Sequence, residues 1–288
     1  TSIGYLSLFS NTSGGNNASL GQISLYNNTT GTTNVAIGSA SLWANTSGNE
    51  NTALGFGSLG GNTTASYNTA VGFKTLFNNT TVSELTAIGY QALYSNTIAG
   101  YNTGVGYRTL YSNTTGGSNT AVGYQALYLD NGGGGNTALG DGCLYSNVLG
   151  NDNTSAGYHA LYYNTAGNNT AFGSAALLSN TTGNGNTAMG ASSLNANTTG
   201  QKNTAIGEGV LSSLTTGTLN TGLGWAADGG PTNVSMTNCT LIGYGTGGSN
   251  AGNNKVCIGN TSITSIKGQV NFTTYSDERF KINIKSET

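Results

Sequence analysis

Few side chains in this sequence of 288 residues are suited to acid–base, nucleophilic or metal chemistry. His159 is the only histidine, and we expect it to face solvent. Cys143, Cys239 and Cys257 are an odd number of cysteines with no Cys-x-x-Cys spacing. Calcium-binding repeats need a dense pattern of Asp, and the chain has too few carboxylates for one. The sequence therefore predicts no metal and no cofactor.

Glycosidases use two carboxyl groups that lie about 5 to 9 Å apart. Asp130, Asp141 and Asp152 are close in sequence, but they fall at different positions of the repeat described below. We therefore expect them on different parts of the fold, and polysaccharide depolymerisation stays an alternative rather than the leading hypothesis.

Charge is sparse, with 8 Lys+Arg against 10 Asp+Glu and a net charge of -2. No Lys/Arg cluster that could neutralise phosphates occurs in the first 250 residues, which makes nucleic acid an unexpected partner. No run of about 18 apolar residues exists, so no membrane insertion is expected. The chain begins without Met, and we interpret it as processed or as one piece of a longer protein.

A repeat organises nearly the whole sequence. Sixteen glycines mark it, and most of them are 17 residues apart: Gly4, Gly21, Gly38, Gly55, Gly72, Gly89, Gly106, Gly123, Gly140, Gly157, Gly173, Gly190, Gly207, Gly224, Gly243 and Gly259. We number positions in each unit from this marker glycine. A short fixed period of this kind indicates a solenoid or a fibre.

Two positions of the repeat are apolar and one is small. Position -1 is apolar in every unit, position -2 is usually Ala, and we expect the core of a rung to contain one Leu and one Ile-type residue. Position +4 is Leu in the first thirteen units: Leu8, Leu25, Leu42, Leu59, Leu76, Leu93, Leu110, Leu127, Leu144, Leu161, Leu177, Leu194 and Leu211.

Seventeen residues are too few for a helix-turn-helix unit, and alternating small and β-branched residues followed by Asn-Thr-Thr-Gly are typical of short strands with corners. We therefore predict an all-β fold, an elongated β-solenoid or β-roll of about sixteen 17-residue rungs. The marker glycine is explained by a positive φ or by a neighbouring backbone too close for a Cβ.

Asn recurs at positions -4 and +7, where stacked amides can form ladders and Asn tolerates the backbone angles of corners. We interpret both Asn columns mainly as residues of amide ladders and corners. Eight Asn-x-Ser/Thr sequences at +7 also make N-glycosylation an alternative. These candidate acceptors are Asn11, Asn28, Asn45, Asn62, Asn79, Asn113, Asn180 and Asn197.

A coil of 17 residues encloses only one thin layer of side chains, and its burial falls short of the entropy lost on ordering a rung. Contact with other copies of the chain is the obvious further source of burial, so we expect a homo-oligomeric fibre. Aromatic residues at +1 and +5, such as Tyr124 and Tyr128, would supply contact area.

The run Asn119-Thr-Ala-Val-Gly-Tyr-Gln-Ala-Leu127, repeated with variations, resembles the repeats of phage tail fibres and related surface fibres. It is also similar to shorter repeats in the heads of trimeric autotransporter adhesins. The resemblance implies a homotrimer on a virion or in an extracellular location, and we also consider end-to-end contacts between fibres. Cell-surface glycans are a further candidate partner, because rows of Tyr and Asn offer stacking faces and hydrogen-bonding amides.

A second resemblance is local. Tyr275-Ser-Asp-Glu-Arg-Phe-Lys-Ile-Asn-Ile284 looks like the opening of the endosialidase-type intramolecular chaperone, which assists fibre folding and then cuts itself off. The resemblance implies that Ser276 is the nucleophile and Lys281 its base, with cleavage just before Ser276. We expect a repeat shaft over residues 1–260, a connecting strand region over 261–275 and a truncated start of the chaperone over 276–288.

These observations favour a structural and adhesive fibre shaft of a tail fibre or cell-surface appendage, with an autoprocessing junction at its C-terminus and no catalysis in the shaft. Two alternatives remain. One is a depolymerase tailspike, and the other is a monomeric solenoid that binds carbohydrate or ice.

Overall fold

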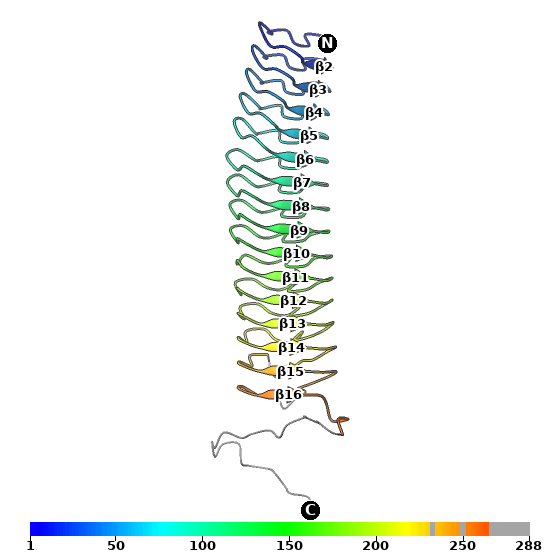
Figure 1. The fold of residues 1–288 in the computed structure, drawn as a ribbon, viewed down its shortest axis with the longest axis vertical. Coiled ribbons are helices and arrows are strands. Elements are labelled where there is room, and N and C mark those ends of the chain that lie inside the picture. Colours follow the sequence, from blue (N-terminus) through cyan, green and yellow to red (C-terminus); the bar gives the residue numbers. More distant parts are fainter. Residues whose placement is uncertain (231–233, 248–251, 265–288) are drawn as a thin grey trace, which may run out of the picture.

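The computed structural model describes residues 1–230, 234–247 and 252–264. They form a rod in which each unit of the repeat is one turn stacked on the previous turn (Figure 1). Each turn contributes one short strand to a single parallel sheet of sixteen strands in sequence order. The strands are β1 (Ser2–Ile3), β2 (Ala18–Leu20), β3 (Val35–Ile37), β4 (Thr52–Leu54), β5 (Thr69–Val71), β6 (Thr86–Ile88), β7 (Thr103–Val105), β8 (Thr120–Val122), β9 (Thr137–Leu139), β10 (Thr154–Ala156), β11 (Thr170–Phe172), β12 (Thr187–Met189), β13 (Thr204–Ile206), β14 (Thr221–Leu223), β15 (Thr240–Ile242) and β16 (Val256–Ile258).

The predicted β-solenoid is thus confirmed, and its core is an inner layer of Leu and Ala. Leu127 and Ala121 are fully buried, as are their equivalents in most rungs. Leu8 is only half-buried because the first rung has no rung before it to cover it. All twelve later leucines of the +4 column have no exposed surface.

The expectation of a second large apolar residue in the core was wrong. In strand β8 the middle residue, Ala121, points inward, while Thr120 and Val122 on either side face outward. Side chains alternate across a strand, so an inward residue at -2 forces the residues at -3 and -1 out. A thin coil has room for Ala at -2, and the larger side chain at -1 is left on the surface.

The rest of each rung consists of turns that are also bonded from rung to rung. The backbone N–H of Leu25 donates to the carbonyl of Ser41 in the next rung at 3.0 Å, and that of Ile23 donates to Tyr5 in the previous rung at 2.8 Å. Residues at +2 and +4 have left-handed backbone angles, for example Gln125 with φ of 52° and Leu127 with φ of 54°. These two left-handed residues bend the chain around the Leu side chain.

Both explanations of the marker glycine hold. Gly89 has a φ of +132°, a conformation that residues with a Cβ rarely adopt, and a Cβ there would overlap the carbonyl oxygen of Gly106 in the next rung. The same overlap with the following marker glycine recurs along the coil. Glycine is therefore required by the conformation and by the close stacking of rungs.

Units of unusual length leave the sheet register unchanged. The 16-residue unit between Gly157 and Gly173 still pairs Ala156 with Phe172, and the 19-residue unit before Gly243 still pairs Leu223 with Ile242. Strand pairing in the sheet is therefore independent of the exact length of the unit.

Candidate functional site

Two columns of Asn run inside the rod as amide ladders. In the +7 column, Nδ2 of Asn45 donates to Oδ1 of Asn28 in the preceding rung at 2.8 Å and to the carbonyl of Gly48 in its own rung at 3.1 Å. In the -4 column, Oδ1 of Asn34 accepts from the backbone N–H of Asn51 at 3.0 Å. These bonds satisfy polar groups that would otherwise be buried without partners.

The candidate glycan acceptors lie in the +7 ladder. Asn11, in the first rung, is exposed. The other seven have no exposed surface, and a glycan on any of them has no room in the folded coil: Asn28, Asn45, Asn62, Asn79, Asn113, Asn180 and Asn197. The geometry therefore favours the ladder role over the acceptor role at these seven positions.

The outer face of the sheet carries two parallel columns. The first is the Thr column at -3, which runs unbroken from Thr52 in β4 to Thr240 in β15. Thr partners align directly across neighbouring strands, as in the pair Thr120 and Thr137. None of these twelve strand hydroxyls forms a hydrogen bond within the described residues. They are therefore free to bond to water or to another molecule.

The second column on this face is the apolar column at -1. Its side chains retain substantial exposure, for example 37 % for Ile37 and 46 % for Leu20 and Leu223. The -3 and -1 columns contain no charged residue from β1 to β16. We call these two columns together the sheet face. A contiguous apolar surface of this length is typical of an interaction surface.

Aromatic rings form two further columns beside the sheet. At +5, the rings of Tyr94 and Tyr111 stack with centroids 5.3 Å apart, and stacking continues from Phe77 to Tyr162. At +1, the rings stack from Phe56 to Tyr124. Between these columns, the guanidinium of Arg108 lies 5.3 Å from the ring centroid of Tyr111 and its Nε donates to Gln91 at 2.9 Å.

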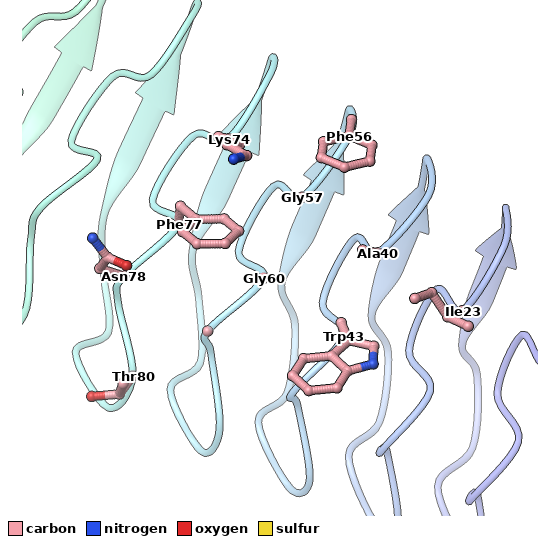
Figure 2. A pocket seen from close by; sticks show the side chains of 11 residues that line it. Ile23, Ala40, Trp43, Phe56, Gly57, Gly60, Lys74, Phe77, Asn78 and Thr80 are labelled. Atoms are coloured by element: carbon pink, nitrogen blue, oxygen red, sulfur yellow. The ribbon is translucent and has the colours of Figure 1, made fainter.

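The +5 aromatic column is interrupted in the fourth rung, where Gly60 replaces the ring. The interruption leaves a pocket of about 470 Å³. Figure 2 shows Trp43 and Phe77 on either side of Gly60, with Phe56 beside them and Lys74 near Phe77. Sequence reasoning missed this site, although Gly at a position that is aromatic in the nine surrounding rungs was a visible signal.

The acidic residues do not form a glycosidase pair. Asp130 is fully buried in the Asn ladder, where it replaces Asn, while Asp141 and Asp152 are exposed. Asp141 instead lies 3.9 Å from Nε2 of His159, which is half-buried and stacks on Tyr158. The three carboxylates are thus on different parts of the coil.

Cysteines and metal-ligating groups are also scattered. Cys143, Cys239 and Cys257 are free thiols, and Sγ of Cys143 donates to the carbonyl of Gly157 at 2.6 Å. Among the described residues, no three His, Cys, Asp or Glu side chains come together in a way that could hold a metal ion. The same part of the chain contains no helix with the length and apolarity needed to cross a membrane.

The proposed junction residues Ser276 and Lys281 lie outside the described residues, as does most of the connecting region 261–275. Comparison with protein-family models, with curated proteins and with solved structures finds no match. The surface features of the described rod are thus the sheet face, the aromatic columns and the pocket at Gly60.

Proposed function

We propose that this chain is the shaft of a surface fibre, assembled from three copies and used for attachment, with an autoprocessing junction at Ser276 and Lys281. The observation that carries the proposal is the sheet face, which presents an uncharged apolar column along the rod. The resemblance to trimeric fibre repeats supports three as the number of copies. On this proposal the fibre is extracellular or on a virion, and cell-surface glycans are its binding partners.

Self-association through the sheet face explains why large side chains at -1 are tolerated outside. Packing a second sheet face against Ile88 and Val122 would remove water from the whole column, since each of these side chains is 39 % exposed in the single chain. Each rung adds the same small contribution, and the contributions sum over the length of the rod.

Mass measurement under native conditions tests this proposal. We expect a trimer for the natural chain and a monomer for the double variant Val122→Lys/Leu139→Lys, because two charges on the sheet face would oppose its burial. The matched control is Thr64→Lys, an exposed corner residue whose side chain makes no hydrogen bond within the described residues, and it should remain trimeric. If the natural chain is a monomer, the proposed fibre shaft of three copies is wrong.

A second candidate function is ice binding by a monomer, favoured by the twelve free Thr hydroxyls on the same face. They repeat at the strand spacing of about 4.8 Å and alternate with methyl-bearing side chains, a regular array that can order water. Thermal hysteresis in a monomeric sample, lost in Val122→Lys/Leu139→Lys, would support this function over the fibre.

A further inference from the structure

We propose that the pocket at Gly60 binds one pyranose ring that carries a carboxylate, as found in acidic polysaccharides. This inference rests on the attachment role proposed above and names where and what the fibre would bind. The aromatic column at +5 has a ring in each of its first ten units except one: Phe9, Tyr26, Trp43, Phe77, Tyr94, Tyr111, Tyr128, Tyr145 and Tyr162.

The missing ring leaves a space of the right size. Trp43 and Phe77 are two rungs apart, which is about 10 Å along the rod at the usual strand spacing. Gly57 and Gly60 form the floor, and Phe77 leans over it, since a Cβ on Gly60 would lie 3.1 Å from Cε2 of Phe77. The volume of about 470 Å³ falls within the range of small-molecule sites, about 300 to 1,000 Å³.

The walls suit the apolar face of a sugar ring. Trp43 and Phe56 are 44 % and 49 % exposed, so both offer aromatic surface to a bound ring. In Figure 2 they lie on different sides of the glycine floor, with Phe77 completing the wall. Flat aromatic surfaces bind the C–H groups of a ring, while the polar edge of the ring stays free to form hydrogen bonds.

Two neutral polar groups lie at one edge of the pocket. Asn78 and Thr80 are among the residues that line it, and neither side chain has a hydrogen bond within the described residues. An amide and a hydroxyl can both donate and accept, which matches the hydroxyl groups of a sugar. A purely aromatic ligand would leave both groups unused.

The positive charge of Lys74 favours an acidic sugar over a neutral one. Nζ of Lys74 lies 5.2 Å from the ring centroid of Phe77 and 5.6 Å from that of Phe73, and Lys74 forms no ion pair in the described part of the chain. No acidic side chain lines the pocket. An unneutralised ammonium at the edge of an apolar site favours a ligand with a carboxylate.

Fluorescence titration tests the proposal, because Trp43 is one of only two tryptophans and Trp225→Phe removes the other signal. The probes are a glucuronate-containing trisaccharide, its neutral glucose counterpart and benzoate. We expect the acidic sugar to bind about tenfold more tightly than the neutral one, the effect of one charged hydrogen bond. Equal affinity for both sugars, or tighter binding of benzoate, would overturn the proposal.

Two variants locate the site. Gly60→Phe restores the ring found in neighbouring rungs and fills the pocket, so it should abolish binding. Its Cβ would lie 3.1 Å from Cε2 of Phe77, so the ring of Phe77 must shift, and an unchanged β-sheet signal in circular dichroism is the check that the coil is still folded. Lys74→Gln introduces the residue that occupies this position at Gln91 and Gln125, and it should remove the preference for the acidic sugar. Arg108→Gln, a cation between intact aromatic columns, is the matched control and should change nothing. Binding that survives Gly60→Phe would exclude this pocket.

The same samples separate the two proposals. Native mass reports on the fibre, and the titration reports on the pocket. A monomer that binds the acidic sugar would contradict the proposed trimeric shaft but support the sugar site at Gly60. A trimer that binds none of the probes would support the shaft and contradict the sugar site.

Discussion

Asn147 donates a hydrogen bond from Nδ2 to Oδ1 of Asp130 over 3.2 Å, inside the +7 ladder. The other carboxyl oxygen of Asp130, Oδ2, is buried without a partner and occupies the place of an Asn Nδ2 beside Oδ1 of Asn113. Two acceptors facing each other are unfavourable unless one carries a proton. Burial raises the pKa of Asp130 to about 8, against the opposing effect of hydrogen bonds from Asn147 and Gly133.

The first prediction is that stability falls as pH rises through the neutral range. In the unfolded chain Asp130 has its ordinary pKa of about 3.9, so between about pH 4 and the folded value of about 8 only the folded state holds the proton. The free energy of unfolding should therefore decrease by up to about 1.4 kcal/mol per pH unit over this window and level off above it.

Denaturant unfolding of Asp130→Asn at pH 5 and pH 8 checks the first prediction. The amide restores the ladder without a proton, so the pH dependence should largely vanish and the variant should be the more stable protein at pH 8. Asp152→Asn, at an exposed position, is the control and should retain the natural pH dependence. Identical curves for Asp130→Asn and the natural chain would contradict the buried, protonated carboxyl.

The second prediction compares two neighbours with the same left-handed backbone. Leu127→Ala should lower the free energy of unfolding by about 2 to 5 kcal/mol, because it empties part of the core. Gln125→Ala has nearly the same φ but a side chain outside the core, so its effect should be below about 1 kcal/mol. Chemical unfolding of both variants measures the difference, and equal effects would mean that the Leu column is not the core.

The third prediction concerns the marker glycines. Gly89→Ala should destabilise the rod by at least about 1 to 3 kcal/mol, since it imposes a strained φ and an overlap with Gly106. Gly100→Ala is the control, because a Cβ there meets only Val82, at 3.8 Å. Calorimetry of the two variants should give a large fall in melting temperature for the first and almost none for the second.

The fourth prediction is the length of the particle. Sixteen rungs at about 4.8 Å give a repeat region about 75 Å long. Small-angle scattering measures the maximum dimension, and copies packed side by side would thicken the rod without shortening it. A maximum dimension below about 50 Å would be incompatible with the stacked coil.

The fifth prediction tests the junction in a longer precursor that continues into a complete chaperone domain. Ser276→Ala should assemble but remain uncleaved, and Lys281→Ala should behave in the same way because the hydroxyl loses its base. Gel electrophoresis distinguishes cleaved from uncleaved chains. Normal cleavage of Ser276→Ala would exclude this residue as the nucleophile.

Much of the fold could be predicted because the repeat displays each structural column many times. Leu at +4 and Asn at +7 recur together, and only a coil that stacks like on like gives every unit the same environment. The direction of the -1 side chains was not predictable from hydrophobicity, because Val122 and Ala121 are both apolar and only one can face inward. The thin interior selects the smaller one.

Other features depend on geometry that residue types do not reveal. Leu rarely adopts left-handed backbone angles, so nothing in the sequence indicates the φ of 54° at Leu127 or the turns that form most of each rung. Asp130 is visibly an exception in its column, but its raised pKa follows from burial beside Asn113. The pocket at Gly60 likewise required the positions of Trp43 and Phe77.

The tolerance of 16- and 19-residue units has an evolutionary consequence. Because β10 and β11, like β14 and β15, pair in register despite the changed spacing, a recombination that adds or removes a unit and leaves the junction one residue short or two residues long would still encode a continuous sheet. Each duplication would lengthen the molecule by one strand spacing, about 4.8 Å. The length of the rod is then set by the number of units. A local change such as the missing ring at Gly60 can arise in one unit while the other units keep the coil intact.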